Sequence, residues 1–457
     1  MKERKRYTHN IFAVAATIGY FIMGSIVSVV RYWQYDIWYY DFGIFSRALF
    51  NASRFKLPII DHFIVPGKII FADHFNPSLF ILTPLYWITS QQEILLIAQA
   101  FCVALSGYLL YRIGLLLLKS EIVSLAIMAS YFLFVGLQNA VITEFHELTV
   151  MTLFLMATYY FFVSKKKKLF LLFFLVTLGF KESLFLLGVG IGTFVLFERK
   201  EWRDIGLTVI IFSLIYGLLT TKFIIPYFSG RPYYYLPGAI DLHNLFQPVI
   251  KIKTLVLSFG SFLFLPLGIL SFFPLYAFHF AARFLSDGST RWDLGLHYSA
   301  EIAPTLAFGT LLALSRIQKM TSRKIIIFIS VTTVIVSAFL FRVILHGPFL
   351  LVFNKAFYEH TKTFIYLDQL VDKVPENESV AAQNNLAVRF IKQHSYILRD
   401  EYWKIPANYI VMDMRDGQNP NNFLGIKDER KLLKSLLDDG RYSLHFHKGS
   451  AYIFKRN

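Results

Sequence analysis

Runs of apolar residues long enough for membrane-spanning helices occupy most of this 457-residue chain. The hydrocarbon core of a bilayer is about 30 Å thick and needs roughly 20 apolar residues in a helix, fewer when aromatic or basic residues anchor the ends. A stretch at 77–89, interrupted by Pro84, is more typical of a re-entrant or interfacial segment. The sequence predicts an all-α polytopic membrane protein with about eleven transmembrane helices, near residues 11–30, 94–118, 121–137, 148–163, 168–180, 183–197, 205–221, 255–268, 270–285, 301–315 and 325–345.

The composition excludes several other classes of protein. Charged residues make up 17% of the chain, against about 25% in soluble domains, and the mean hydropathy is +0.50. These values argue against a cytosolic enzyme, a disordered regulator and a fibrous repeat. Cys102 is the only cysteine, so an intramolecular disulfide and a cysteine-based zinc site are both excluded.

The net charge of +16 does not indicate a nucleic-acid partner, because the cations lie in short clusters between apolar runs. Clusters placed in this way set the orientation of spans, with the basic loops on the cytoplasmic side. Eleven crossings that start from a cytoplasmic N-terminus put all four clusters on that side, and the C-terminal tail on the other. The clusters lie at residues 2–6, 165–168, 199–203 and 316–324.

Two loops and the tail are the large segments predicted on the outer face. The transmembrane domain, 1–345, has a first outer loop at 31–76, in which an amphipathic stretch at 44–55 is expected to lie on the membrane surface, and a second outer loop at 222–254. Residues 346–457 have a soluble composition and predict a small extracytoplasmic α/β domain. Strands are expected at 379–382, 396–399, 409–414, 442–447 and 451–454, with helices near 385–391 and 427–437.

Asp41 follows the first apolar run, within an aromatic segment of the first outer loop. A carboxylate there can act as general base on an acceptor hydroxyl or bind a divalent ion. The alternative is a helix N-cap for the amphipathic stretch, since Asp is a favoured capping residue. Asp36, five residues earlier, is a weaker candidate for the same role.

Other polar residues are predicted at the outer ends of spans, where an outward-opening cavity would gather them. Asp73 and His74 are candidates for binding a metal or an acceptor, and the alternative is hydrogen bonding within the loop. His146 and Glu147 are candidate site residues whose spacing is not that of a zinc site. Their alternative role is helix capping.

Cations are also expected near these ends. Lys181 is followed by Glu182 between two apolar runs, which indicates either a structural ion pair or a cation that binds phosphate oxygens. Arg231 could bind a phosphate or stack on a sugar, although interfacial aromatic belts look similar. His297 and Tyr298 open the last-but-one apolar run and are candidates for substrate binding.

Three glycines at alternate positions, Gly188, Gly190 and Gly192, resemble a nucleotide-binding loop superficially. They lie inside an apolar run with no strand before them. Close packing of helices is therefore the predicted role.

Six motifs in the same order resemble a family of prokaryotic predicted membrane proteins, domain-of-unknown-function family 2079. The resemblance covers nearly the whole chain. Its motifs are YDFGIF at 40–45, HFNP at 74–77, FHE at 145–147, KE at 181–182, HY at 297–298 and, in the tail, segments at 374–375, 382–385 and 410–413.

That family looks like a branch of the GT-C superfamily, whose members transfer a sugar from a polyprenyl-phosphate donor on the outer face of the membrane. The resemblance implies a GT-C-like fold in the cytoplasmic membrane and a catalytic acid in the first outer loop, here Asp41. The superfamily often has paired acids at this place, whereas Tyr40 and Phe42 flank Asp41. A metal ion, Mg or Mn, therefore stays an open question, and a lone carboxylate acting as base is compatible with the pattern.

The leading hypothesis is an inverting glycosyltransferase with a polyprenyl-phosphate sugar as donor and a hydroxyl of a glycan, lipid or protein as acceptor. Lys181, Arg231 or His297 would offset the phosphate charge, and Asp41 would take the acceptor proton. Asp41, His74, His146, Glu147 and Lys181 are predicted to line one cavity. The alternative is a transporter or flippase of lipid-linked glycans, for which the sequence offers no internal repeat.

Overall fold

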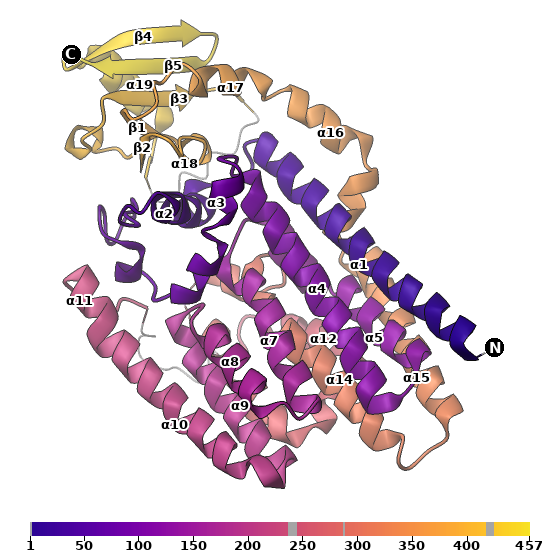
Figure 1. The fold of residues 1–457 in the computed structure, drawn as a ribbon. Coiled ribbons are helices and arrows are strands. Elements are labelled where there is room, and N and C mark those ends of the chain that lie inside the picture. The colour runs from indigo at the N-terminus through magenta and orange to yellow at the C-terminus, as the bar shows by residue number, and fades with distance from the viewer. Residues whose placement is uncertain (1, 236–244, 287, 417–424) are drawn as a thin grey trace. The chain divides into compact units, whose positions relative to one another are not determined.

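The computed structural model describes residues 2–235, 245–286, 288–416 and 425–457 (Figure 1). The chain forms two compact units, each of which is described by itself. The helical unit comprises Met1–Ser25, His74–Leu79 and Ile97–Leu350, and the mixed unit comprises Ile26–Asp73, Phe80–Leu96 and Leu351–Asn457. The mixed unit therefore contains both the tail and most of the first outer loop. The domain boundary at residue 345 stays a prediction.

Apolar helices make up the helical unit, and each of the eleven predicted runs contains a helix. Helices α1 and α4 extend into the mixed unit at one end. The helices are α1 (Lys2–Trp33), α4 (Glu93–Leu118), α5 (Glu121–Leu133), α6 (Val135–Ile142), α7 (Glu147–Val163), α8 (Lys167–Leu178), α9 (Phe185–Glu198), α10 (Arg203–Leu219), α11 (Ile225–Ser229), α12 (Ile250–Gly260), α13 (Phe273–Phe284), α14 (Ala303–Ile317) and α15 (Arg323–Phe339).

The predicted number of crossings is not confirmed. Among the described residues, five helices are long and apolar enough to cross a membrane, and α5 with α6, bent by 53°, would add a sixth. Helices such as α8 and α13 have 12 residues, or about 18 Å at 1.5 Å per residue, which is shorter than the hydrocarbon core. The segment Pro77–Ile88 is also too short for a span, in agreement with the sequence.

Helices α9 and α10 run side by side (Figure 1). Their backbones meet at Gly192 and Gly206, where a Cβ on Gly192 would lie 2.8 Å from the Gly206 carbonyl oxygen. Glycines permit this close approach of the two backbones, and the dispersion contacts that result stabilise the packing of α9 on α10. A Cβ on Gly188 would likewise meet Ser213 of α10, and one on Gly190 would meet Leu275 of α13, so the prediction that Gly188, Gly190 and Gly192 serve helix packing is confirmed.

The mixed unit combines short helices with one sheet. Its helices are α2 (Ile44–Ser53), α3 (Leu85–Ile88), α16 (Lys355–Lys362), α17 (Ile365–Val371), α18 (Asn384–Ala387) and α19 (Glu429–Asp438), and a single π-helical turn, η1 (Tyr39–Gly43), precedes α2. Its strands are β1 (Ser379–Ala382), β2 (His394–Ile397), β3 (Tyr409–Asp413), β4 (Tyr442–Lys448) and β5 (Ala451–Arg456). All five predicted strands are therefore present, the second displaced by two residues.

The strands form one sheet in the order β2-β1-β3-β5-β4. Strand β1 is parallel to β2 and β3, with Val380 opposite Tyr409, whereas β5 is antiparallel to β3 and β4. The central strand β3 is buried at every position because it has neighbours on both sides and α19 contributes Leu432 and Leu436 to the same core. The edge strand β4 is mostly exposed.

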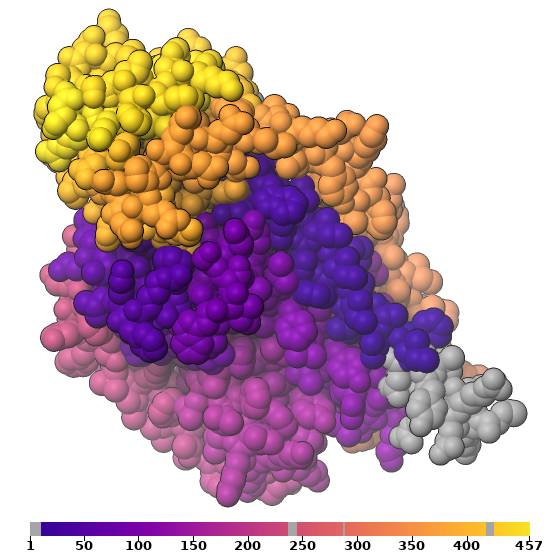
Figure 2. Space-filling view, turned by 45° about the horizontal axis from the view of Figure 1, so that its top comes forward, coloured from indigo at the N-terminus to yellow at the C-terminus, as the bar shows by residue number. Residues whose placement is uncertain are grey.

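The first loop and the tail pack together within the mixed unit, and Figure 2 shows the tail, in orange and yellow, against the indigo and purple first loop. Eight of the ten residues of α2 are buried. They include Arg47, whose Nη1 donates to the carbonyl oxygens of Ile391, at 2.6 Å, and Gln393. A helix lying on a membrane surface would keep its charged face in water, so α2 is instead an internal element of this unit.

Candidate functional site

Buried ionisable side chains gather where the helices of the helical unit are interrupted. His146 is the N-cap of α7, and its Nδ1 accepts the Leu148 N–H at 3.4 Å and lies 3.1 Å from Glu147 Oε2. Gln99 of α4 fixes this break between α6 and α7: its Nε2 donates to the Glu144 carbonyl oxygen at 2.8 Å, and its Oε1 accepts the His146 N–H at 2.7 Å. His146 therefore has the helix-capping role considered for this motif, and its ring is buried.

Lys181 pairs with Glu147 rather than with its neighbour in sequence. Lys181 Nζ lies 3.1 Å from Glu147 Oε1, with the lysine side chain 14% exposed and the glutamate fully buried. A buried charge of one sign is costly without a partner, so the two side chains depend on each other. The lysine side chain is the less buried member of the pair.

Glu182 binds three other groups. Its carboxylate accepts His74 Nδ1 at 2.8 Å, the Phe75 N–H at 3.1 Å and the Tyr233 hydroxyl at 2.6 Å, and it is fully buried. The His74 ring stacks on Tyr235 with centroids 4.5 Å apart. Glu182 therefore holds the residues just before Pro77 next to the second outer loop, directly through Tyr233 and indirectly through the stacking of His74 on Tyr235.

His297, from a distant part of the sequence, stacks on His146. The two rings stack with centroids 3.6 Å apart and an interplanar angle of 15°. The loop that carries His297 is anchored on α6, where Asn139 Nδ2 donates to the Leu294 carbonyl oxygen at 2.7 Å. The ring of Tyr298 lies 4.2 Å from that of His297.

Arg283 of α13, which is not among the predicted site residues, holds the same loop. Its Nε donates to the Arg291 carbonyl oxygen at 2.8 Å and its Nη2 to the Asp293 carbonyl oxygen at 2.5 Å. The side chain is buried, next to His279, which lies 3.6 Å from Glu301. An arginine inside an apolar run is the signal that could have found it, since such residues are rarely accidental.

The structure thus brings six of the predicted site residues together inside the helical unit. They form two groups in contact, His74 with Glu182, and Glu147 with Lys181 and the stacked rings of His146 and His297; the chain neighbours Lys181 and Glu182 connect the two groups. We call these six residues the buried polar cluster. It combines one lysine with three imidazoles and two carboxylates, in buried surroundings where a low dielectric strengthens hydrogen bonds to a charged ligand. The members are His74, His146, Glu147, Lys181, Glu182 and His297.

Arg231 makes none of the contacts that join the buried polar cluster. It is exposed, and its backbone N–H donates to Ser229 Oγ at 3.2 Å. The following part of the second outer loop, residues 236–244, lies outside the described residues.

Asp41 belongs to the mixed unit, in the π-helical turn η1. It is half-buried. Helix α2 begins at Ile44 with Gly43 as its N-cap and no side-chain cap, so the capping alternative for Asp41 is wrong. The N–H of Tyr40, next to it, donates to Asn384 Oδ1 at 3.0 Å.

Other acids of the first loop lie beside basic side chains. Asp36 pairs with Arg31 at 2.7 Å, and Asp73 lies 3.7 Å from His62 Nε2. Asp61, which is 2% exposed, accepts Arg399 Nη2 at 2.8 Å. Within the described ranges no three His, Cys, Asp or Glu side chains are placed to hold a metal ion, so Asp73 and His62 form at most a pair of ligands.

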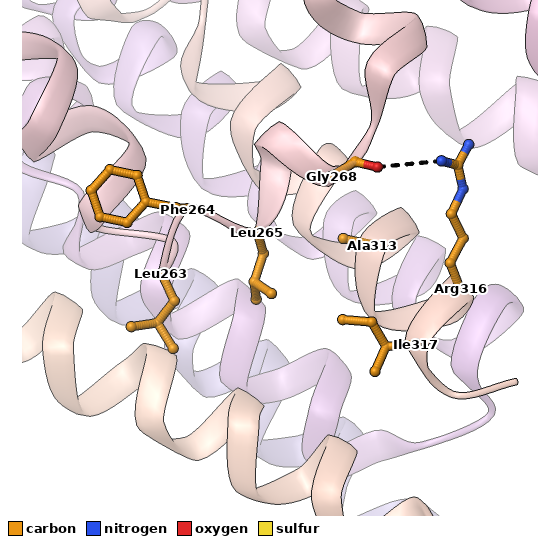
Figure 3. Close-up of a pocket in the computed structure, with 7 residues that line it drawn as sticks. All are labelled: Leu263, Phe264, Leu265, Gly268, Ala313, Arg316 and Ile317. Atoms are coloured by element: carbon orange, nitrogen blue, oxygen red, sulfur yellow. Dashed lines mark hydrogen bonds between the residues drawn. The ribbon is translucent and has the colours of Figure 1, made fainter. Parts of the chain in front are cut away.

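A cavity of about 290 Å³ lies at the C-terminal end of α14, beside Ala313, Arg316 and Ile317 (Figure 3). Leu263, Phe264, Leu265 and Ile317 line it, and Arg316 at its edge donates to the Gly268 carbonyl oxygen. The lining residues of α14 lie 10 to 14 positions after its first residue, Ala303, so about 15 to 21 Å separate this cavity from the start of the helix near His297. It is apolar and is not part of the buried polar cluster.

Comparisons with known proteins identify both a family and a fold. The profile of a family described as Predicted membrane protein (DUF2079) matches residues 31–448. The crystal structure of ArnT from Cupriavidus metallidurans bound to undecaprenyl phosphate is 10% identical, with 95% of this chain and 97% of that chain covered and a TM-score of 0.51. The apo structure of the same protein is 10% identical, with 96% and 98% covered and a TM-score of 0.49. No curated protein matches the chain in sequence.

Proposed function

The chain belongs to the DUF2079 family of predicted membrane proteins, and we propose that it is a membrane glycosyltransferase. Its donor would be a sugar linked to a polyprenyl phosphate. The acceptor would be a hydroxyl of a glycan, lipid or protein on the outer face of the cytoplasmic membrane. The ArnT-like fold supports this proposal, together with the GT-C kinship that the sequence motifs imply.

The observation that carries the proposal is the buried polar cluster in a helical unit built mostly of apolar helices. A chain inserts ionisable side chains among membrane helices at a cost of about 2.5 to 3.5 kcal/mol each on insertion scales, so their presence indicates function. Lys181, as the partly accessible cation, would bind the donor phosphate, with His146 and His297 as further hydrogen-bond donors. Undecaprenyl phosphate, which ArnT binds, is the chemical class of ligand that this arrangement fits.

In the proposed reaction, Asp41 takes the proton of the acceptor hydroxyl as the oxygen attacks the anomeric carbon. The bond from that carbon to the phosphate oxygen breaks, and the polyprenyl phosphate leaves as an anion near Lys181. The sugar is transferred with inversion. That one outward-facing cavity is lined by Asp41, His74, His146, Glu147 and Lys181 stays a prediction.

The test is transfer of labelled sugar by purified full-length protein in liposomes, with a panel of undecaprenyl-phosphate hexoses and pentoses as donors and bacterial membrane glycans and lipids as acceptors. We expect Asp41→Asn to lower the rate by about 10² to 10⁴, the usual contribution of a general base. The matched control is Asp372→Asn, which changes an exposed acid of the same unit and should leave the rate unchanged. Full activity of Asp41→Asn would remove the assigned base.

The same liposomes address the alternative function. A flippase would move the labelled donor between leaflets without any transfer of its sugar. That outcome, with no product from any donor in the panel, would replace the glycosyltransferase proposal.

A further inference from the structure

The role of the C-terminal tail follows from how it contacts the segment that carries Asp41. Helix α18 of the tail packs against the π-helical turn η1 within the mixed unit. The first N–H groups of any helix have no acceptor inside the helix and need one from outside. The N-cap residue of η1, Trp38, provides no side-chain cap, and Asn384 Oδ1 of the tail accepts the Tyr40 N–H at 3.0 Å.

Asn384 is itself held firmly. It is 3% exposed and follows β1, whose end is tied to the end of the parallel strand β3 by its neighbour Gln383. Gln383 Oε1 accepts the Asp413 N–H at 2.7 Å, and its Nε2 donates to the Asp413 carbonyl oxygen at 3.1 Å. The oxygen that caps η1 is therefore attached to the rigid centre of the sheet.

A second contact from the tail reaches the same turn. Asp61 accepts the Ile397 N–H, at the end of β2, at 2.9 Å, and its own N–H donates to the hydroxyl of Tyr39 at 3.3 Å. Tyr39 is the first residue of η1 and is buried. The ends of β1 and β2 thus hold η1 at two points, through Asn384 and through Asp61.

We propose that the tail is a structural part of the catalytic site and that Asn384 is a positioning residue for Asp41. Asn384 fixes the backbone one residue before Asp41, and so sets the direction of the carboxylate. The inference rests on the proposed function, because it takes Asp41 as the general base. It gives the tail a role in catalysis that does not require the tail to contact the substrate.

The test compares three variants of the full-length protein. Asn384→Leu keeps the size of the side chain and removes the acceptor, whereas Asn384→Asp keeps an acceptor oxygen at the same place. The control, Asn408→Leu, replaces an exposed asparagine of the tail that donates a hydrogen bond to Glu378. The first readout is hydrogen exchange of the Tyr40 amide, which is independent of activity. We expect it to be about 5- to 10-fold faster in Asn384→Leu and unchanged in the other two.

The second readout is sugar transfer. We expect Asn384→Leu to lower kcat by about 10- to 100-fold with little change in KM, because a small displacement of a reacting group has effects of this size. Asn384→Asp should restore the rate. In the Asp41→Asn background the Asn384→Leu change should have no further effect on kcat, whereas a merely structural loss would lower it again.

The outcomes separate the two proposals. If Asp41→Asn is inactive, and either Asn384→Leu is fully active or its Tyr40 exchange is unchanged, the positioning role is refuted and the proposed function stands. If Asp41→Asn is fully active, the general base is refuted whatever the Tyr40 exchange shows. Should Asn384→Leu not fold, Asn384→Ser serves the same comparison, because its hydroxyl is too short to reach the Tyr40 N–H.

Discussion

The pair of Lys181 and Glu147 allows a structural ion pair to be distinguished from a phosphate site. Lys181→Met would leave the fully buried Glu147 carboxylate without its cation. The attraction at 3.1 Å is about 5 kcal/mol at an effective dielectric constant of 20, and breaking such a pair from one side costs about 3 to 5 kcal/mol. This corresponds to a change of roughly 100- to 4,000-fold in the unfolding equilibrium.

The double variant Glu147→Gln with Lys181→Met removes both charges. It should cost only about 1 kcal/mol, because no unpaired charge remains. Denaturant titration of the full-length protein in mixed micelles measures all three variants. Equal losses in Lys181→Met and in the double variant would refute the reasoning that the two charges depend on each other.

Binding of undecaprenyl phosphate then tests the functional role of the same residues. A charge-assisted hydrogen bond contributes about 1.5 to 3 kcal/mol, so Lys181→Met and the double variant should bind about 10- to 150-fold more weakly. Glu147→Gln should bind more tightly, because Lys181 loses its internal competitor. Measured affinities that do not differ among these variants would leave the pair with a structural role alone.

Two further predictions concern stability. Arg399→Met should lower the free energy of unfolding by about 2 to 4 kcal/mol, because Arg399 compensates the buried Asp61 carboxylate. Burial raises the pKa of Asp61, and Arg399 opposes this rise, so in the variant the pKa of Asp61 in the folded protein lies further above its unfolded value. Folding the variant with an ionised Asp61 is therefore most costly at neutral pH. The loss of stability should shrink as the pH falls through the folded pKa of Asp61, because the carboxyl is then protonated. Denaturant titrations of the wild type and the variant at pH 5 and pH 7.5 measure the loss of stability and its dependence on pH. A loss of the same size at both pH values would contradict the assigned role of Asp61. Gly206→Leu should separate α9 from α10 and cost about 3 kcal/mol of stability, because its Cβ would lie 2.7 Å from the Leu196 nitrogen. Thermal unfolding measures this loss, and Gly268→Leu, with open space around its Cβ, is the control variant.

The sequence predicts local structure well where one physical signal dominates. Apolar length identifies where the helices lie, and alternation with turn residues identifies all five strands of the tail. The number of crossings is harder to predict, because an apolar run does not show whether Pro or Gly ends its helix early. Helix α12, for example, ends at Gly260, and a 3₁₀ turn with Pro266 follows within the same run.

Contacts between distant segments were predicted only in part. Six candidate residues from four segments meet in the buried polar cluster, but the partner of Lys181 is Glu147, 34 positions earlier, and not the adjacent Glu182. In an extended backbone adjacent side chains point to opposite sides, and Lys181 is extended, with φ of −164° and ψ of 145°. The joining of tail and first loop has no signal in composition, since it depends on single pairs such as Asp61 and Arg399.

The hydrogen bond between Tyr40 and Asn384 joins residues 344 positions apart in the chain. A ribosome adds about 5 to 20 residues per second, so Tyr40 is made roughly 20 to 70 s before its acceptor exists. During that interval the long apolar helices that follow must enter the bilayer, and the Tyr40 N–H in the turn at Tyr39–Gly43 still lacks its Asn384 acceptor. The nascent protein therefore cannot acquire its finished geometry around Asp41 until translation is nearly over, and a chain released early would carry that turn incomplete.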